Sequence, residues 1–207
     1  MKKLVLIGGG GHCKSVIDTI KRLETYDEIV ITDPCFPGCR EILDIKIAGN
    51  DDALAELKRA GFDEAFITVG SIKDTRLRQS LYYKARDLGF TIPNIIDPAA
   101  CISQYAVMQE GIFVGKGAII NADAHIGKMA IVNTGAIIEH ECTIGEYTHI
   151  AVGAVLCGGI TIGSHSLIGA GAVIIQGTVI GSHTIIGAGS TVLRDVEDGQ
   201  IVKGLVK

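Results

Sequence analysis

The chain has 207 residues, enough for one large domain or two small ones, each with its own hydrophobic core. Its 47 % hydrophobic and 20 % charged residues exclude a disordered chain, while 27 glycines and the absence of tryptophan indicate a repetitive structure in place of an ordinary globular core. A formal net charge of −4, with no basic run carrying interleaved aromatic residues, argues against nucleic acid and anionic membranes as partners.

The N-terminal stretch "MKKLVLIGGGGH" has only four apolar residues between its lysines and its glycines, too few for the core of a signal peptide. No later segment approaches the length of a membrane span, so we expect a cytoplasmic protein. In a reducing compartment the six cysteines, which form no CxxC pair, are expected to be small buried residues and not disulfides. A zinc site at Cys35 and Cys39 is the alternative, and the lack of a second pair disfavours it.

From Met1 to about Asp97, short aliphatic runs alternate with amphipathic stretches. The runs "KLVLIG", "EIVITD" and "AFITVG" predict buried parallel strands. The stretches "CKSVIDTIKRL", "DDALAELKRAG" and "TRLRQSLYYKARDLG" predict helices, because their apolar residues recur at helical spacing. This alternation predicts a βαβ sheet, and Pro93 and Pro98 mark a change of architecture.

Beyond Pro98 the sequence repeats every six residues. Steps of six from Ile102 to Val192 give sixteen positions, all of them aliphatic or methionine, and glycine follows at seven. The residue two positions earlier is nearly always small. Such hexads predict a parallel β-helix, a triangular coil of three six-residue sides with the aliphatic side chains inside. Sixteen hexads make about five coils, each about 4.8 Å above the last.

Residues eighteen apart stack in such a coil. His165 and His183, each in a "GSH" turn, are therefore expected as surface neighbours about 4.8 Å apart. Solvated polar turns are the favoured interpretation of this pair, and a two-histidine metal site is the alternative.

His140 and His149 are nine residues apart, half a coil, which places them on opposed parts of one triangular section. Packing of three β-helices around a threefold axis would bring His140 of one chain towards His149 of the next, so a homotrimer is the natural assembly. A histidine beside a carboxylate suits general-base catalysis, and Glu139 and Glu141 flank His140. Because side chains alternate along a strand, a contact requires local backbone bending. The residues alone leave a purely structural histidine open.

As a whole the chain resembles the sugar acyltransferases of the PglD/NeuD type. The resemblance rests on "GGGGHCKSV" after the first strand, on "VNTGAIIEHECTIGEYTHIAVGA" and on the uninterrupted hexads. It implies a small Rossmann-like α/β domain over residues 1–97 that binds a nucleotide sugar. It also implies a left-handed parallel β-helix over residues 98–207 that binds acetyl-CoA and carries the catalytic residues.

The resemblance implies that His140 is the catalytic base, that Glu141 raises its basicity, and that His149 lies beside the acetyl group. It also implies that the backbone of Ala170 and Ala188 lines the CoA groove, and these two alanines are eighteen apart and should stack. Gly158, eighteen after His140, would bring its backbone N–H towards the thioester oxygen, an interpretation drawn from spacing. No metal is expected.

The nucleotide sugar is assigned by the resemblance to the N-terminal half: Gly10, Gly11 and His12 of the glycine loop, Asp33 after the second strand and Gly70 after the third. A glycine loop that opens a helix presents N–H groups to phosphate. Asn133 is expected either to face the sugar or to form a turn. A dinucleotide fingerprint is the rival interpretation, and it fails because its third glycine is replaced by Cys13 in one frame and by Lys14 in the other.

Three stretches depart from the family pattern: Cys13 after the loop histidine, "GSIKD" after the third strand and the ending "VKGLVK". The predicted reaction is acetyl transfer from acetyl-CoA to the amine of a nucleotide-linked amino sugar, with a UDP-linked 4-amino-4,6-dideoxy sugar expected ahead of dTDP or GDP sugars. The alternatives are O-acetylation of a sialic acid, a metal-dependent hydratase, whose closely spaced histidines are absent here, and a non-catalytic sugar-binding scaffold.

Overall fold

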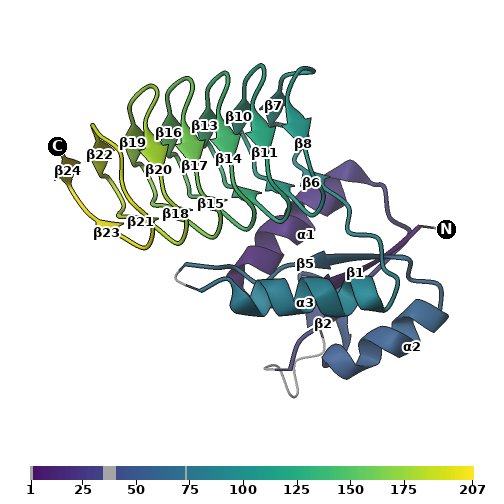
Figure 1. Cartoon of the computed structure of the whole chain (residues 1–207). Helices are drawn as coiled ribbons and strands as arrows, with labels where there is room; N and C mark the ends of the chain where they lie inside the picture. The colour runs from purple at the N-terminus through teal and green to yellow at the C-terminus, as the bar shows by residue number, and fades with distance from the viewer. Residues whose placement is uncertain (1, 35–40, 73) are drawn as a thin grey trace. The chain divides into compact units, whose positions relative to one another are not determined.

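The structure is a computed structural model that describes residues 2–34, 41–72 and 74–207 (Figure 1). The chain divides into two compact units, Met1–Ser71 with Thr75–Ile95 and Ile72–Asp74 with Ile96–Lys207. Among the described residues, no helix has the length and apolarity needed to span a membrane. Cys35 and Cys39 lie outside the described residues.

The first unit is built on a five-stranded sheet in the order β3-β4-β2-β1-β5. Its strands are β1 (Lys3–Ile7), β2 (Glu28–Thr32), β3 (Glu41–Ile42), β4 (Ile45–Gly49) and β5 (Glu64–Ile67). Strands β4, β2, β1 and β5 run parallel, whereas β3 pairs antiparallel with β4.

The sheet is therefore mixed and not purely parallel. The sequence did not predict the hairpin of β3 and β4. Strand β4 alternates partly buried and exposed residues. It lacks the continuous aliphatic run of the central strand β1, in which Leu4, Val5, Leu6 and Ile7 are fully buried.

Three helices accompany this sheet: α1 (Gly11–Leu23), α2 (Leu54–Arg59) and α3 (Arg76–Asp87). Helix α1 buries Val16, Ile17 and Ile20 at helical spacing, as predicted. The predicted helix at "DDALAELKRAG" is shorter than expected, because its first residues form the 3₁₀ turn η1 (Asp51–Ala53). Asn50 caps that turn by accepting a hydrogen bond from the backbone N–H of Asp52.

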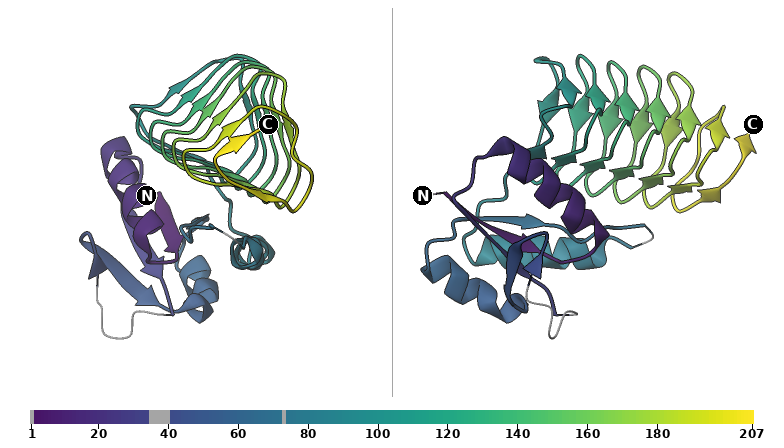
Figure 2. Two further views of the ribbon diagram at one scale, coloured as in Figure 1. Left: turned by 90° about the vertical axis from the view of Figure 1, so that its left-hand side faces the viewer. Right: turned by 180° about the vertical axis from the view of Figure 1, so that it is seen from behind.

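The second unit is the predicted left-handed parallel β-helix, with the triangular cross-section visible in Figure 2. Each side is a sheet of two-residue strands, named here after one member. The β13 sheet contains β7 (Cys101–Ile102), β10 (Ile119–Ile120), β13 (Ile137–Ile138), β16 (Val155–Leu156), β19 (Val173–Ile174), β22 (Thr191–Val192) and β24 (Leu205–Val206). The β14 sheet contains β8 (Val107–Met108), β11 (His125–Ile126), β14 (Thr143–Ile144), β17 (Thr161–Ile162) and β20 (Val179–Ile180). The β15 sheet contains β6 (Ile95–Ile96), β9 (Phe113–Val114), β12 (Ile131–Val132), β15 (His149–Ile150), β18 (Leu167–Ile168), β21 (Ile185–Ile186) and β23 (Ile201–Val202).

Paired strands are offset by eighteen residues, so the aliphatic positions of the hexads stack in columns inside the coil. One such column, almost completely buried, runs through Ile120, Ile138, Leu156, Ile174 and Val192. Burial of a side chain of this size contributes roughly 1.5–3 kcal/mol to stability. The repeated aliphatic positions therefore form the core of the coil.

The regular register ends after Val192. In the last coil Ile185 pairs with Ile201 and Thr191 with Leu205, so the spacing falls below eighteen. The divergent ending "VKGLVK" supplies strand β24, and it closes the stack with a side shorter than a full hexad.

Candidate active site

His140 and Glu141 lie at the corner where the chain passes from β13 to β14. Glu141 has a φ of 61°, in the left-handed region. This conformation breaks the strand-like alternation of side chains and brings the two consecutive residues into contact: His140 Nδ1 lies 3.0 Å from Glu141 Oε2. The local bending that the sequence analysis required is therefore present. A carboxylate at Nδ1 keeps a proton on that nitrogen and leaves Nε2 as the basic atom.

Gly158 lies directly against the His140 ring in the next coil. A methyl group added at Gly158 would lie 2.5 Å from Cε1 of His140 and 2.7 Å from Nε2. The backbone N–H of Gly159 donates to the carbonyl of His140 at 2.9 Å and holds the two coils together here. Gly158 thus provides the surface on which the imidazole rests, a role that the sequence analysis did not foresee.

Asn133 and His149 form a second pair, on the β15 sheet side of the coil. The side-chain amide of Asn133 donates to His149 Nε2 at 3.2 Å, while its Oδ1 accepts the backbone N–H of Thr134 at 2.8 Å. Asn133 therefore binds the backbone of its own turn and orients His149, and its contact with the sugar stays a prediction. His149 lies in β15, whereas His140 follows β13, so the two histidines occupy different parts of the coil, as predicted.

Ala170 and Ala188 stack in consecutive coils at the corner between the β15 and β13 sheets. Both are exposed, and the backbone N–H of Gly189 donates to the carbonyl of Ala170 at 2.8 Å. Val152, half exposed, occupies the same position one coil earlier. This corner therefore presents small and apolar side chains, together with its backbone, to solvent.

In the first unit the predicted nucleotide-sugar residues gather at the carboxyl end of the parallel strands. Gly10, Asp33 and Gly70 line one pocket of about 250 Å³. Gly11 lines a neighbouring hollow of about 380 Å³ together with Lys14. Both Gly10 and Gly11 are exposed, with open space where a side chain would stand.

Two contacts hold the glycine loop in place. The carboxylate of Asp33 accepts the backbone N–H of Gly9 at 2.5 Å. A methyl group at Gly70 would lie 3.8 Å from Cβ of His12, so these two predicted residues are neighbours. Gly10 precedes the first turn of α1 with extended backbone and no side-chain cap, which leaves the helix N-terminus open to an anion.

Cys13, one of the departures from the family pattern, is buried in α1 beneath this loop. Burial raises the pKa of its thiol to about 11, with the charge of Asp33 acting in the same direction and a hydrogen bond with Thr68 opposing it. The thiol therefore stays protonated at neutral pH and is a packing residue, not a nucleophile.

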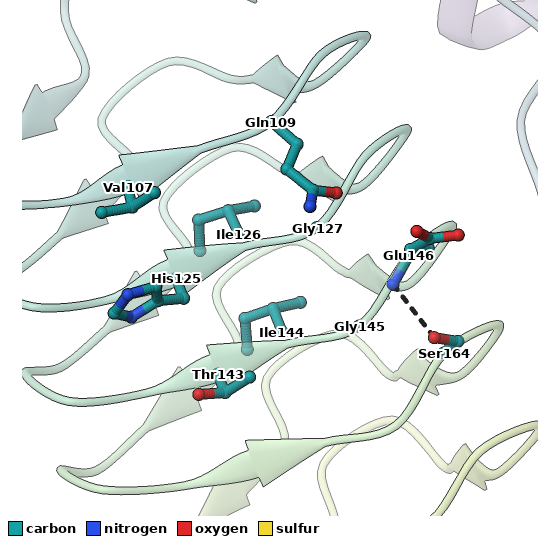
Figure 3. Close-up of a pocket in the computed structure, with 10 residues that line it drawn as sticks. All are labelled: Val107, Gln109, His125, Ile126, Gly127, Thr143, Ile144, Gly145, Glu146 and Ser164. Carbon is teal, nitrogen blue, oxygen red and sulfur yellow. Dashed lines mark hydrogen bonds between the residues drawn. The ribbon is translucent and has the colours of Figure 1, made fainter.

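Figure 3 shows a further hollow, of about 320 Å³, on the outer face of the β14 sheet. Its polar residues include His125, Thr143 and Ser164, whose hydroxyl accepts the backbone N–H of Glu146 at 3.2 Å. It contains none of the predicted site residues. In the part of the chain that the structure describes, no three His, Cys, Asp or Glu side chains are grouped so that they could hold a metal ion.

The rings of His165 and His183 stack with centroids 4.9 Å apart and an interplanar angle of 4°, close to the expected spacing. Tyr147 extends the stack at 5.2 Å from His165. Ring nitrogens in parallel planes direct their lone pairs side by side and not towards a common point, so this arrangement does not favour the alternative of a two-histidine metal site.

Comparison with known proteins places the chain in a family. Residues 3–85 match the family model described as the PglD N-terminal domain, and residues 159–194 match the bacterial transferase hexapeptide model of six repeats. The comparison with curated proteins gives no match.

Solved structures resemble the chain over nearly its whole length. One is a histidine-to-alanine mutant of GDP-perosamine N-acetyltransferase from Caulobacter crescentus in complex with CoA and GDP-perosamine, 39 % identical, with 99 % of this chain and 94 % of that chain covered and a TM-score of 0.90. Another is the acetyltransferase domain of PglB from Neisseria gonorrhoeae in complex with acetyl coenzyme A, 34 % identical, with coverages of 98 % and 96 % and a TM-score of 0.91. WeeI from Acinetobacter baumannii, at 22 % identity, coverages of 99 % and 97 % and a TM-score of 0.79, shares the fold. The glycine loop, the carboxylate-oriented histidine and the hexad coils thus occur in a chain that belongs to the PglD/NeuD-type family of sugar acyltransferases.

Proposed function

We propose that the protein transfers the acetyl group of acetyl-CoA to the amine of a nucleotide-linked amino sugar. The observation that carries the proposal is the contact between His140 Nδ1 and Glu141 Oε2, which leaves Nε2 as a base at an exposed corner of the coil. The relatives crystallised with CoA and GDP-perosamine, and with acetyl coenzyme A, support the assignment of both substrates.

The mechanism is a direct transfer. The neutral sugar amine attacks the thioester carbonyl, His140 accepts a proton from the attacking nitrogen, and the carbon–sulfur bond breaks to release CoA as its thiol after protonation. Glu141 stabilises the imidazolium that forms. The backbone N–H of Gly158 is proposed to face the thioester oxygen, where negative charge develops in the transition state. A base is required because a protonated sugar amine is inert as a nucleophile.

We further propose a homotrimer in which three β13 sheets face a common axis. The outward strand residues of that sheet include Ile119, Ile137, Val155 and Val173, whereas those of the β14 sheet include His125, Thr143 and Thr161. An aliphatic face of this kind suits burial between copies.

The position of this sheet gives the trimer a catalytic consequence. The β13 sheet lies between the corner of Ala170 and Ala188 and the corner of His140. Packing about a threefold axis would set the first corner of one copy beside the second corner of its neighbour, with acetyl-CoA between them. Light scattering should give three times the 21.8 kDa chain mass, and a monomer at micromolar concentration would contradict the shared site.

A cytoplasmic location completes the proposal, since acetyl-CoA and nucleotide sugars are available there. Cell fractionation tests it, and recovery of the protein in the membrane or periplasmic fraction would overturn it.

The enzymatic test measures acetyl-CoA consumption with a panel of UDP-, dTDP- and GDP-linked amino sugars. Hydroxylamine treatment of the product distinguishes N-acetylation from O-acetylation, because hydroxylamine cleaves an ester and leaves an amide intact.

His140→Ala should lower kcat by roughly 10²–10⁴-fold, the usual range for a general base, with little change in the KM for acetyl-CoA. Glu141→Ala should cost less, since Glu141 transfers no proton. His125→Ala, an exposed histidine outside the site, is the matched control.

A His140→Ala enzyme with near-full kcat from pH 6 to 9 would eliminate the mechanism. Consumption of acetyl-CoA with none of the amino sugars in the panel would contradict the proposed reaction itself.

A further inference from the structure

The pocket at the end of the parallel strands is a slot with apolar walls and two carboxylates. Strands β1, β2, β4 and β5 all end at it, and its apolar lining includes Ile7, Val69, Leu77 and Leu81. Leu77 is 57 % exposed and Leu81 is buried, one helical turn apart on α3. At about 250 Å³ the pocket is smaller than the roughly 300–1,000 Å³ of sites that enclose a whole drug-sized ligand. It therefore suits one part of a nucleotide sugar.

Asp51 is the carboxylate of this pocket that the sequence analysis did not single out. It follows β4 and opens η1, where the Asn50 cap fixes the backbone. Its Oδ1 accepts the hydroxyl of Thr32, a fully buried residue of β2, at 3.1 Å. Within the described residues its Oδ2 has no hydrogen-bond partner. Asp51 thus presents an oriented carboxylate to the slot.

The charge of the pocket decides which part of the ligand fits. Asp33 and Asp51 supply negative charge, and among the residues that the structure describes no Lys or Arg lines the slot, so these two carboxylates disfavour a phosphate group there. The neighbouring hollow is the better place for phosphates, because it combines the open glycine loop and Lys14 with a single carboxylate, Glu41. A ribose carries several hydroxyl groups that need polar partners, so it matches aliphatic walls less well than a base does. A nucleobase matches them, because its faces are apolar and its polar groups lie at the edge.

A carboxylate discriminates among nucleobases by their edges. Guanine presents two adjacent donors, N1–H and the 2-amino group, which match the two oxygens of a carboxylate. Uracil and thymine flank their single N–H with carbonyl oxygens, and adenine and cytosine place a ring-nitrogen acceptor beside the amino group. Each of these four bases would set an acceptor against a carboxylate oxygen, which leaves a desolvated acceptor unpaired.

We infer that the Asp51 carboxylate accepts hydrogen bonds from the nucleobase and selects guanine, so that the sugar acceptor of this enzyme is linked to GDP. This inference rests on the proposed function for the identity of the ligand as a nucleotide sugar. It differs from the UDP sugar that the sequence analysis placed first.

The test is isothermal titration calorimetry of the whole protein with GDP, IDP, UDP and XDP, without acetyl-CoA. GDP should bind more tightly than UDP, and IDP, which lacks the 2-amino group, should bind about 10- to 100-fold more weakly than GDP, the range of one bidentate base contact. Asp51→Asn should weaken GDP binding by a similar factor. The same variant should strengthen XDP binding, because xanthine carries a carbonyl in place of the 2-amino group and an amide can donate to it.

Asp52→Asn is the matched control. Asp52 is the exposed neighbour of Asp51 and does not line the pocket. Its carboxylate accepts the side-chain amide of Asn50 at 3.1 Å, a hydrogen bond that an asparagine oxygen can also accept, so Asp52→Asn should leave all four affinities unchanged. Gain of XDP binding in Asp51→Asn also excludes a mere folding defect, which could only weaken ligands.

Three results would overturn the inference: UDP binding as tightly as GDP, IDP binding as tightly as GDP, or Asp51→Asn weakening GDP and UDP equally, as a ribose contact would. These results are separable from the proposed function. Acetylation of a UDP-linked amino sugar in preference to a GDP-linked one would overturn the inference and leave the reaction intact. Base-specific GDP binding without acetylation of any amino sugar would support the inference and contradict the proposed reaction.

Discussion

Replacement of Gly158 by alanine tests whether the position of the His140 ring controls the rate. The added methyl would lie 2.5 Å from Cε1, about 0.9 Å closer than the 3.4 Å at which ordinary contact begins, so the ring must move by nearly 1 Å. A displacement of about 1 Å in a reacting group can cost on the order of 10²-fold in rate. We expect kcat to fall by about that factor.

The stability of the protein should hardly change in Gly158→Ala. The His140 side chain is 56 % exposed and can swing outwards, and the φ of Gly158 is not in the left-handed region, so alanine fits the backbone. The assay therefore combines steady-state kinetics with thermal unfolding. Loss of kcat with an unchanged Tm supports a positioning role.

The double variant with His140→Ala provides the decisive control. If Gly158 acts only through the imidazole, its replacement should have no further effect once the ring is gone. Full kcat in the single variant would refute the reasoning. So would a loss that multiplies with that of His140→Ala, because the added methyl would then act by displacing a group other than the imidazole. Alanine keeps the backbone N–H that is proposed to face the thioester oxygen, so this variant tests the ring position alone.

Three further predictions concern the assembly, the nucleotide site and pH. Mixed His140→Ala and His149→Ala subunits should regain activity in hybrid trimers, because an interface can then pair two intact histidines. Asp33→Asn should raise the KM for the nucleotide sugar roughly tenfold, the effect of one charged hydrogen bond, without changing that for acetyl-CoA. Burial, and then the charge of His183, lower the pKa of His165 below its usual 6.5, against the opposing charge of a nearby glutamate. The unfolded chain therefore binds more protons below about pH 6.5, and the free energy of unfolding should fall there as the pH drops, measurably less in His165→Asn.

Each of these has a contrary outcome. Hybrids no more active than either parent would place both histidines in one subunit or in separate functions. An Asp33→Asn enzyme with an altered KM for acetyl-CoA alone would reverse the assignment of the two units. For pH, urea unfolding at pH 5 and 7.5 is the measurement, with His125→Asn as the control. A pH dependence that is the same in His165→Asn as in the unaltered chain would remove the stacked rings as its cause.

The β-helix could be predicted in detail because its signal is repeated. Every aliphatic position from Val114 to Val192 in steps of six is buried as the hexads predict, and each step adds independent support. The prediction of strands was incomplete in the first unit, which lies outside the hexapeptide repeats. The hairpin of β3 and β4 occurs once and is short, and its alternating residues lack the continuous aliphatic run of a central strand such as β1.

The sequence names candidate site residues, but it does not predict the contacts between them. The contact between His140 and Glu141 depends on one left-handed residue at a corner, and no rule of side-chain alternation predicts it. Asp51 was missed because the strand before it was missed, although an acid at the carboxyl end of a parallel strand is a recognisable signal. The stacking of Tyr147 on His165 was open to prediction from the eighteen-residue spacing, since both occupy the same corner.

The eighteen-residue register also limits how such a chain can change during evolution. Deletion of one residue between Ile126 and Val132 would turn every later side chain by one position, exchanging inside for outside throughout the remaining coils. Insertion of six residues between His140 and His149 would keep the aliphatic side chains inside but carry His149 to another side of the prism. Insertion of eighteen would preserve both and only lengthen the stack. Viable length variants of the coil should therefore differ by whole coils, while the four-residue connections between its strands stay fixed in length.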